Sequence, residues 1–110
     1  MFGNKMTRIA RYAQKNKPEK LVKFLNDKDK SVVLAAIEGL GNCRKEEAFN
    51  PLIPLLRSPD EDICIQAIKA LGTMGRAKAR VHLEHMRTKE NTKAVDDAIM
   101  EALSTLPRSE

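Results

Sequence analysis

The chain has 110 residues with a formal net charge of +5, of which 42% are apolar and 32% are charged. This length allows one domain with a modest core. The longest unbroken apolar run, residues 32–37, is far shorter than the roughly 20 residues of a membrane-spanning helix, so no membrane span is expected. The N-terminus lacks an apolar stretch of signal-peptide length, and Cys43 and Cys64 match no paired metal or redox spacing, so we expect a cytoplasmic protein.

Apolar residues recur along the chain at spacings of three and four, which is the periodicity of helices with one buried face. No segment alternates between apolar and polar residues as a half-buried strand would. The sequence therefore predicts an all-α protein. In chain order, the expected helices cover residues 4–15, 18–26, 30–42, 47–57, 60–74, 77–88 and 92–106.

Punctuating residues agree with these helices. Four side chains precede the third and fifth helices, where their oxygens can cap free backbone N–H groups: Asp27, Asp29, Ser58 and Asp60. Gly41 and Gly72 stand where the same two helices are expected to stop. In the fourth helix, Pro51 can occupy the first position, but Pro54 removes a backbone hydrogen bond. We therefore expect that helix to be short or bent.

An internal repeat organises the chain. The segment AIEGLG at 36–41 recurs as AIKALG at 67–72, an offset of 31 residues, and a weaker copy at 94–103 aligns at an offset of 32. Apolar positions match between copies while the intervening polar residues do not, as a stacked core requires. We expect a single domain over residues 1–110, with a degenerate unit at 1–26, repeats at 27–57 and 58–88, and a terminal half repeat at 89–110.

The segment SPDEDICIQAIKALGTMGRAKARVHLEHM, residues 58–86, resembles the short HEAT-like repeat first noted in phycobilin lyases. Residues 27–56 also follow that pattern, and residues 88–106 follow its first half. The resemblance implies a right-handed α-solenoid of about 3.5 helix-pair repeats, with second helices on the inner face and first helices on the outer face. It does not carry over lyase activity, because it reaches only structural residues.

We expect a non-catalytic scaffold for protein–protein interaction, whose partner is another protein or an acidic peptide. Candidate binding residues point away from the core on the second helices of the inner face: Lys20, Lys23, Asn50, Ile53, Arg57, Val81, Glu84 and His85.

Two alternatives remain open. A basic cluster near the N-terminus would suit nucleic acid, although Tyr12 is the only aromatic residue near it: Lys5, Arg8, Arg11, Lys15 and Lys17. Self-association is the other alternative, because Leu34 and Ile65 occupy outer-face positions that are usually polar in the family pattern. The last helix has no following partner, so its apolar residues Val95, Ile99 and Leu103 are expected to be incompletely covered.

No cofactor or metal is expected. His82 and His85 lie three residues apart, but a third ligand is lacking, and His82 flanks core positions, so it is predicted to be packed. Cys43 and Cys64 are interpreted as small apolar fillers rather than nucleophiles. The glycine-containing turns also lack the spacing of a phosphate-binding loop.

Overall fold

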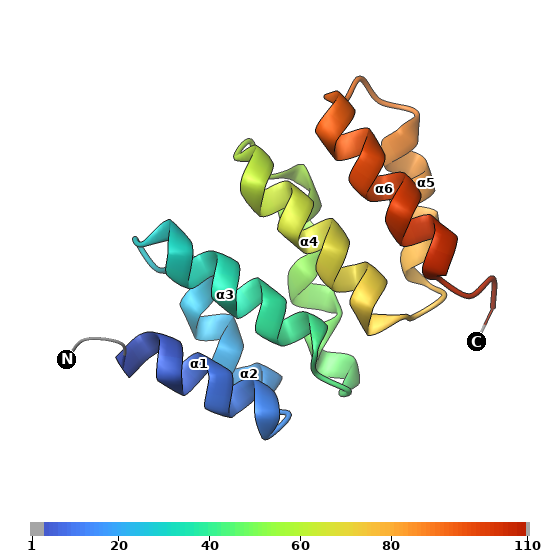
Figure 1. Ribbon diagram of the computed structural model, residues 1–110. Helices are drawn as coiled ribbons and strands as arrows, with labels where there is room; N and C mark the ends of the chain where they lie inside the picture. The colour runs from blue at the N-terminus through green and yellow to red at the C-terminus, as the bar shows by residue number, and fades with distance from the viewer. Residues whose placement is uncertain (1–3, 110) are drawn as a thin grey trace.

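The computed structural model describes residues 4–109, and no strand occurs among them. Figure 1 shows a two-layer stack of helices, an α-solenoid. The first helices lie side by side in one layer: α1 (Asn4–Gln14), α3 (Lys30–Gly41), α4 (Glu61–Met74) and α6 (Lys93–Thr105). The second helices lie behind them: α2 (Pro18–Leu21) continued by the 3₁₀ turn η1 (Val22–Asn26), then η2 (Glu46–Ala48), η3 (Asn50–Leu52) and η4 (Pro54–Arg57), and finally α5 (Ala79–Arg87). The Cα atoms span 43 × 29 × 17 Å, and the shortest extent fits two layers of helices packed at about 8–10 Å.

A continuous apolar core runs between the two layers and repeats with the chain. Ile37 and Ile68, which are related by the 31-residue offset, are both completely buried. Leu52 and Leu83, which have the same relation, are also completely buried in the opposite layer. Burial of each such side chain contributes about 1.5–3 kcal/mol. The apolar positions that recur between units are therefore those at which the helices pack in the core.

The last helix is better covered than its sequence suggests. Val95, Ile99 and Leu103 are 7%, 0% and 8% exposed. The prediction that they are incompletely covered is wrong, because α6 packs along both α4 and α5. This stripe therefore offers no surface for self-association.

The helix predicted over residues 60–74 ends where predicted, but Gly72 is not the residue that stops it. Helix α4 continues to Met74, and Gly75 ends it in the left-handed conformation with φ of 78°. A Cβ atom on Gly72 would lie 3.2 Å from the Cβ of Ala102 in α6, and one on Gly41 would lie 2.9 Å from the Cα of Ala70 in α4. These repeated glycines let successive first helices approach closely.

The proline-containing second helix is broken, as expected for a short or bent helix. Pro51 and Pro54 lack a backbone N–H, so neither can donate a helical hydrogen bond. The chain instead forms three 3₁₀ turns, η2 to η4, in which Leu52 N–H donates to the Phe49 carbonyl at 3.1 Å and Leu56 N–H donates to the Ile53 carbonyl at 3.1 Å. The turns still place Leu52 in the core.

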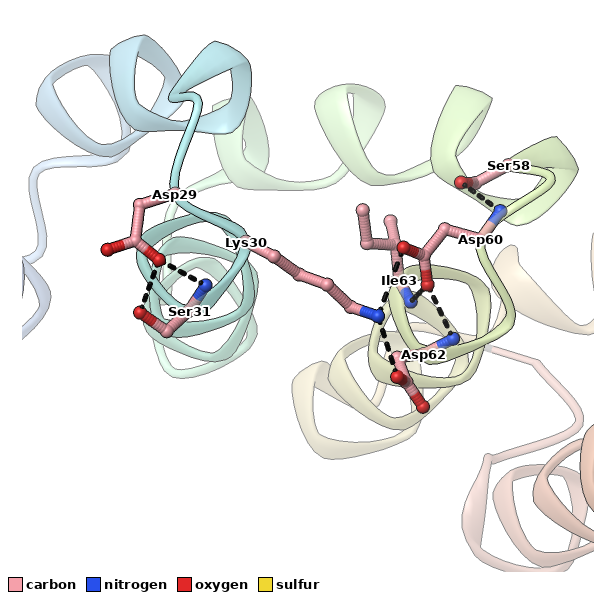
Figure 2. Close-up of polar contacts among 7 residues, drawn as sticks. All are labelled: Asp29, Lys30, Ser31, Ser58, Asp60, Asp62 and Ile63. Atoms are coloured by element: carbon pink, nitrogen blue, oxygen red, sulfur yellow. Dashed lines mark hydrogen bonds and ion pairs between the residues drawn. The ribbon is translucent and has the colours of Figure 1, made fainter.

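The turns between units hold the helix starts in register, as Figure 2 shows. The Asp29 carboxylate accepts from Ser31 N–H at 2.9 Å, and the Asp60 carboxylate accepts from Asp62 N–H at 3.0 Å, so both aspartates are N-caps as predicted. Lys30 reaches across to the next unit, 3.1 Å from Asp60 and 2.7 Å from Asp62. The hydrogen bond from Lys30 is the main cause that lowers the pKa of Asp60.

Candidate protein-interaction groove

A groove of about 440 Å³ lies between the second helices of the two central units. We call it the inner-face groove, where the inner face is the solvent-exposed surface of the second-helix layer. Four of the eight predicted inner-face residues line it: Ile53, Arg57, Val81 and His85. Five lining residues were not predicted as contacts: Leu56, His82, Met86, Lys89 and Asn91.

The floor of the groove is apolar. Leu56 is buried, and Ile53 and Met86 are half-buried against the core. Val81 differs from these three because 66% of it is exposed on the first turns of α5. A partner side chain that covered Val81 would therefore remove new apolar area from water.

Cationic groups border this floor. Arg57 ends η4, and Lys89 follows α5 in the next turn; both are exposed, and neither forms an ion pair with another described side chain. His85 is exposed beside them on α5. None of the residues lining the groove is acidic. The groove therefore combines an apolar floor with a positively charged border.

The loop at the end of the groove is fixed by Asn91. Its side-chain amide donates to the Met86 carbonyl at 2.8 Å and to the Asp96 carboxylate at 3.1 Å. These bonds tie the end of α5 to the first turn of α6. Lys89 lies in this loop, so the same hydrogen bonds hold its backbone in place.

His82 is packed, as the sequence predicts. It is half-buried, and its ring centroid lies 6.1 Å from that of Phe49 at an interplanar angle of 56°. The ammonium group of Lys78 lies 4.4 Å from the Phe49 ring centroid. Among residues 4–109, no three His, Cys, Asp or Glu side chains gather as a metal site would need.

The other predicted inner-face residues lie outside the groove. Lys20, Lys23 and Asn50 are exposed on earlier second-helix segments. Glu84 is exposed but engaged, because it lies 3.3 Å from Arg80. Arg80 also donates to backbone carbonyls at the C-terminal end of α6. Glu84 is therefore part of the polar contacts that join α5 to α6.

The sequence missed five lining residues for three reasons. Leu56 and Met86 read as core positions because they match across the repeat, and the structure places each at the border of core and groove. Lys89 and Asn91 fall in the turn between predicted helices, where periodicity carries no information about neighbours. The sequence predicts that His82 is packed, and it is packed against Phe49, but it also lines the groove.

Every residue of the basic cluster on α1 and the following turn is exposed, and two of the five contact other side chains. Lys5 pairs with Asp27 at 2.7 Å, and the Arg8 guanidinium lies 5.3 Å from the Phe24 ring centroid. Arg11, Lys15 and Lys17 form no side-chain ion pair with the rest of the described chain. Two of the five cations thus attach α1 to the second helix of its own unit.

The pair proposed for self-association is half-buried on both helices. Leu34 on α3 and Ile65 on α4 are each of intermediate exposure, and Ile65 packs against the core. The Gln66 side chain donates to the Leu34 carbonyl at 3.3 Å, which joins α3 to α4 on this side. Contact between copies through this pair stays a prediction.

Both cysteines are free and buried, as predicted for small apolar fillers. Burial is the main cause that raises the pKa of the Cys43 thiol and that of the Cys64 thiol. The Cys64 thiol donates to the Leu56 carbonyl at 3.3 Å. Neither thiol is poised as a thiolate nucleophile.

Comparison with known families gave one match, in which the family described as HEAT repeats matches residues 18–104. The match covers both central helix pairs, the groove between them and most of α6. Comparison with curated proteins gave no match. Over the described residues, every helix is too short or too polar to cross a membrane.

Proposed function

Because this chain belongs to the HEAT repeat family, we propose that it is a non-catalytic scaffold that binds an acidic segment of another protein on its inner face. HEAT repeats generally serve as protein-interaction scaffolds. The observation that carries the more specific proposal is the inner-face groove. There, 66% of Val81 is exposed over an apolar floor, and no carboxylate lines the groove to balance Arg57 and Lys89.

Two contributions favour binding of an acidic segment at this groove. Covering Val81 and the half-buried floor supplies apolar burial, which drives most protein association. Carboxylates on the partner would meet the cationic border, which favours acidic over basic partners and speeds encounter. A partner that spans the stack would also pass Lys20 and Lys23, which extend positive charge along the same layer.

We place this activity in the cytoplasm and assign the repeats to the short HEAT-like type. The free, buried thiols of Cys43 and Cys64 suit a reducing compartment. The 31-residue spacing between AIEGLG and AIKALG supports the short repeat.

The proposal is tested by retention of proteins from source extract on three immobilised chains, with and without nuclease. The chains are wild type, Val81→Asp and Met100→Asp. Met100 is a matched control, because it is also apolar and 51% exposed but lies on α6, away from the groove. We expect a protein that survives nuclease, is retained by wild type and by Met100→Asp, and is lost from Val81→Asp.

Two results would count against the proposal. Material that disappears with nuclease would transfer the function to the basic cluster on α1 and the following turn. A partner retained equally by all three chains would place binding away from the inner face.

A further inference from the structure

The inner-face groove contains exposed residues that do not follow the 31-residue repeat. Core residues match across the 31-residue offset, and so do the floor residues Leu56 and Met86, but the exposed residues of the groove do not. The equivalent positions in the preceding unit, 31 residues before Arg57, Val81 and Lys89, are occupied by Asn26, Asn50 and Ser58 respectively. The preceding junction therefore has neutral polar residues where this one has two cations and an exposed apolar side chain.

This difference is not needed for folding. Arg57, Val81 and Lys89 are all exposed, and neither cation forms an ion pair with another described side chain. Uncompensated cations beside an exposed apolar residue add no packing to the core. They do give the groove a chemistry that the equivalent place in the preceding unit lacks.

The groove is also polarised along its length. Ile53 lies four residues before Arg57, and Val81 lies eight residues before Lys89, so an exposed or half-buried apolar side chain precedes the cation on both segments. Lys89 extends the border beyond the end of α5, on the loop fixed by Asn91. An occupant would meet apolar surface at one end and positive charge at the turn between units.

We propose that the inner-face groove is a specificity pocket for a large apolar side chain with a carboxylate beside it, the side chain lying over Val81 and Ile53 and the carboxylate lying between Arg57 and Lys89. The carboxylate is an acidic side chain of the partner, as in the acidic segment proposed above. This inference rests on the proposed scaffold function and adds the recognition element. The volume of about 440 Å³ accepts one or two such side chains rather than a whole helix.

The repeat itself supplies the test variants. Arg57→Asn, Val81→Asn and Lys89→Ser install the residues found 31 positions earlier, which the fold already tolerates there. Lys28→Ser is the matched control, because it removes an exposed lysine from the turn before α3, one unit earlier in the stack and outside the groove lining. Thermal melts that match wild type would establish that these variants, and the Arg57→Asn/Lys89→Ser double variant, fold.

The probes are peptides selected from two random libraries, one displayed with a free C-terminus and one with its C-terminus blocked. Each selected peptide is then synthesised in three forms: unchanged, with its carboxylate converted to an amide, and with its apolar residue changed to Ala. Binding to the full chain is measured by fluorescence polarisation. Enrichment from both libraries is expected for an acidic side chain, whereas enrichment from the free library alone would overturn that assignment in favour of the C-terminus.

We expect each peptide change to weaken binding to wild type about tenfold, since a charge-assisted bond and a buried apolar side chain are each of that order. Conversion to the amide should cost almost nothing with the Arg57→Asn/Lys89→Ser chain, because its counter-charges are gone. The Ala change should likewise cost little with Val81→Asn. Lys28→Ser should bind as wild type does.

Three further results would overturn the inference: no enriched peptide, enriched peptides without a carboxylate, or peptide affinities unchanged by the groove variants. These differ from failure of the scaffold function. A protein partner that is lost with Val81→Asp but unaffected by Arg57→Asn/Lys89→Ser would leave the scaffold standing and remove the carboxylate pocket.

Discussion

Substitution of Gly41 by Ala tests the closest approach between two first helices. A Cβ atom at this position would lie 2.9 Å from both the Cα and the Cβ of Ala70 and 3.1 Å from its carbonyl oxygen. Carbon atoms in favourable contact are about 3.5–4.0 Å apart. Because two of these atoms, the Cα and the carbonyl oxygen, belong to the backbone, no rotamer change relieves the overlap, and α3 and α4 must move apart.

The expected magnitude is the difference of two terms. Overpacking of a well-filled interface costs about 1–3 kcal/mol. Replacing a helical glycine by alanine returns about 0.5–1 kcal/mol. We therefore expect Gly41→Ala to lose about 0.5–2 kcal/mol of unfolding free energy, where each kcal/mol lowers the melting midpoint of a domain of this size by about 4–8 °C.

Gly72→Ala is the internal control. Its Cβ would meet the Cβ of Ala102 at 3.2 Å and the Cα at 3.4 Å, so smaller movements of α6, the last helix of the stack, suffice. The packing cost and the helix gain should then nearly cancel, within about 0.5 kcal/mol of wild type. Urea unfolding followed by far-UV circular dichroism measures both. If Gly41→Ala were as stable as wild type, or if Gly72→Ala were the worse of the two, the close-approach argument would be wrong.

Three further predictions concern the caps, the core and the thiols. Asp60→Asn keeps a capping oxygen but loses the charge paired with Lys30; because the folded pKa of Asp60 lies below 3.8, its contribution is present above that pH and is lost as the pH falls through the folded pKa. The melting midpoints of wild type and Asp60→Asn should therefore differ near neutral pH and converge in acid, and a constant gap would contradict this. Ile68→Ala, at a fully buried position, should cost about 2–5 kcal/mol in urea unfolding, and a loss below about 1 kcal/mol would contradict the core assignment. Ellman's reagent should label Cys43 and Cys64 only in denaturant, because burial shields both thiols and raises the pKa of each; rapid labelling of the folded chain would show otherwise.

The order and type of the helices follow from the sequence, because a helix is decided by residues three and four apart. The repeat of Ile37 at Ile68 marks the core, and Asp29 and Asp60 mark the helix starts. Pro54 likewise predicts a broken second helix without any knowledge of its neighbours. Each of these signals is local, or repeats a local signal.

Only the tertiary structure decided how distant segments meet. It gave Gly72 a packing role, because α6 lies against α4 at that point, and it covered the apolar stripe of α6 that the sequence left open. It also brought Lys89, from a turn without periodicity, to the groove that holds Arg57 and Val81. The sequence determined which faces are apolar, but the stacking of one unit on the next determined which apolar and charged residues share a surface, because that depends on contacts some 30 residues apart along the chain.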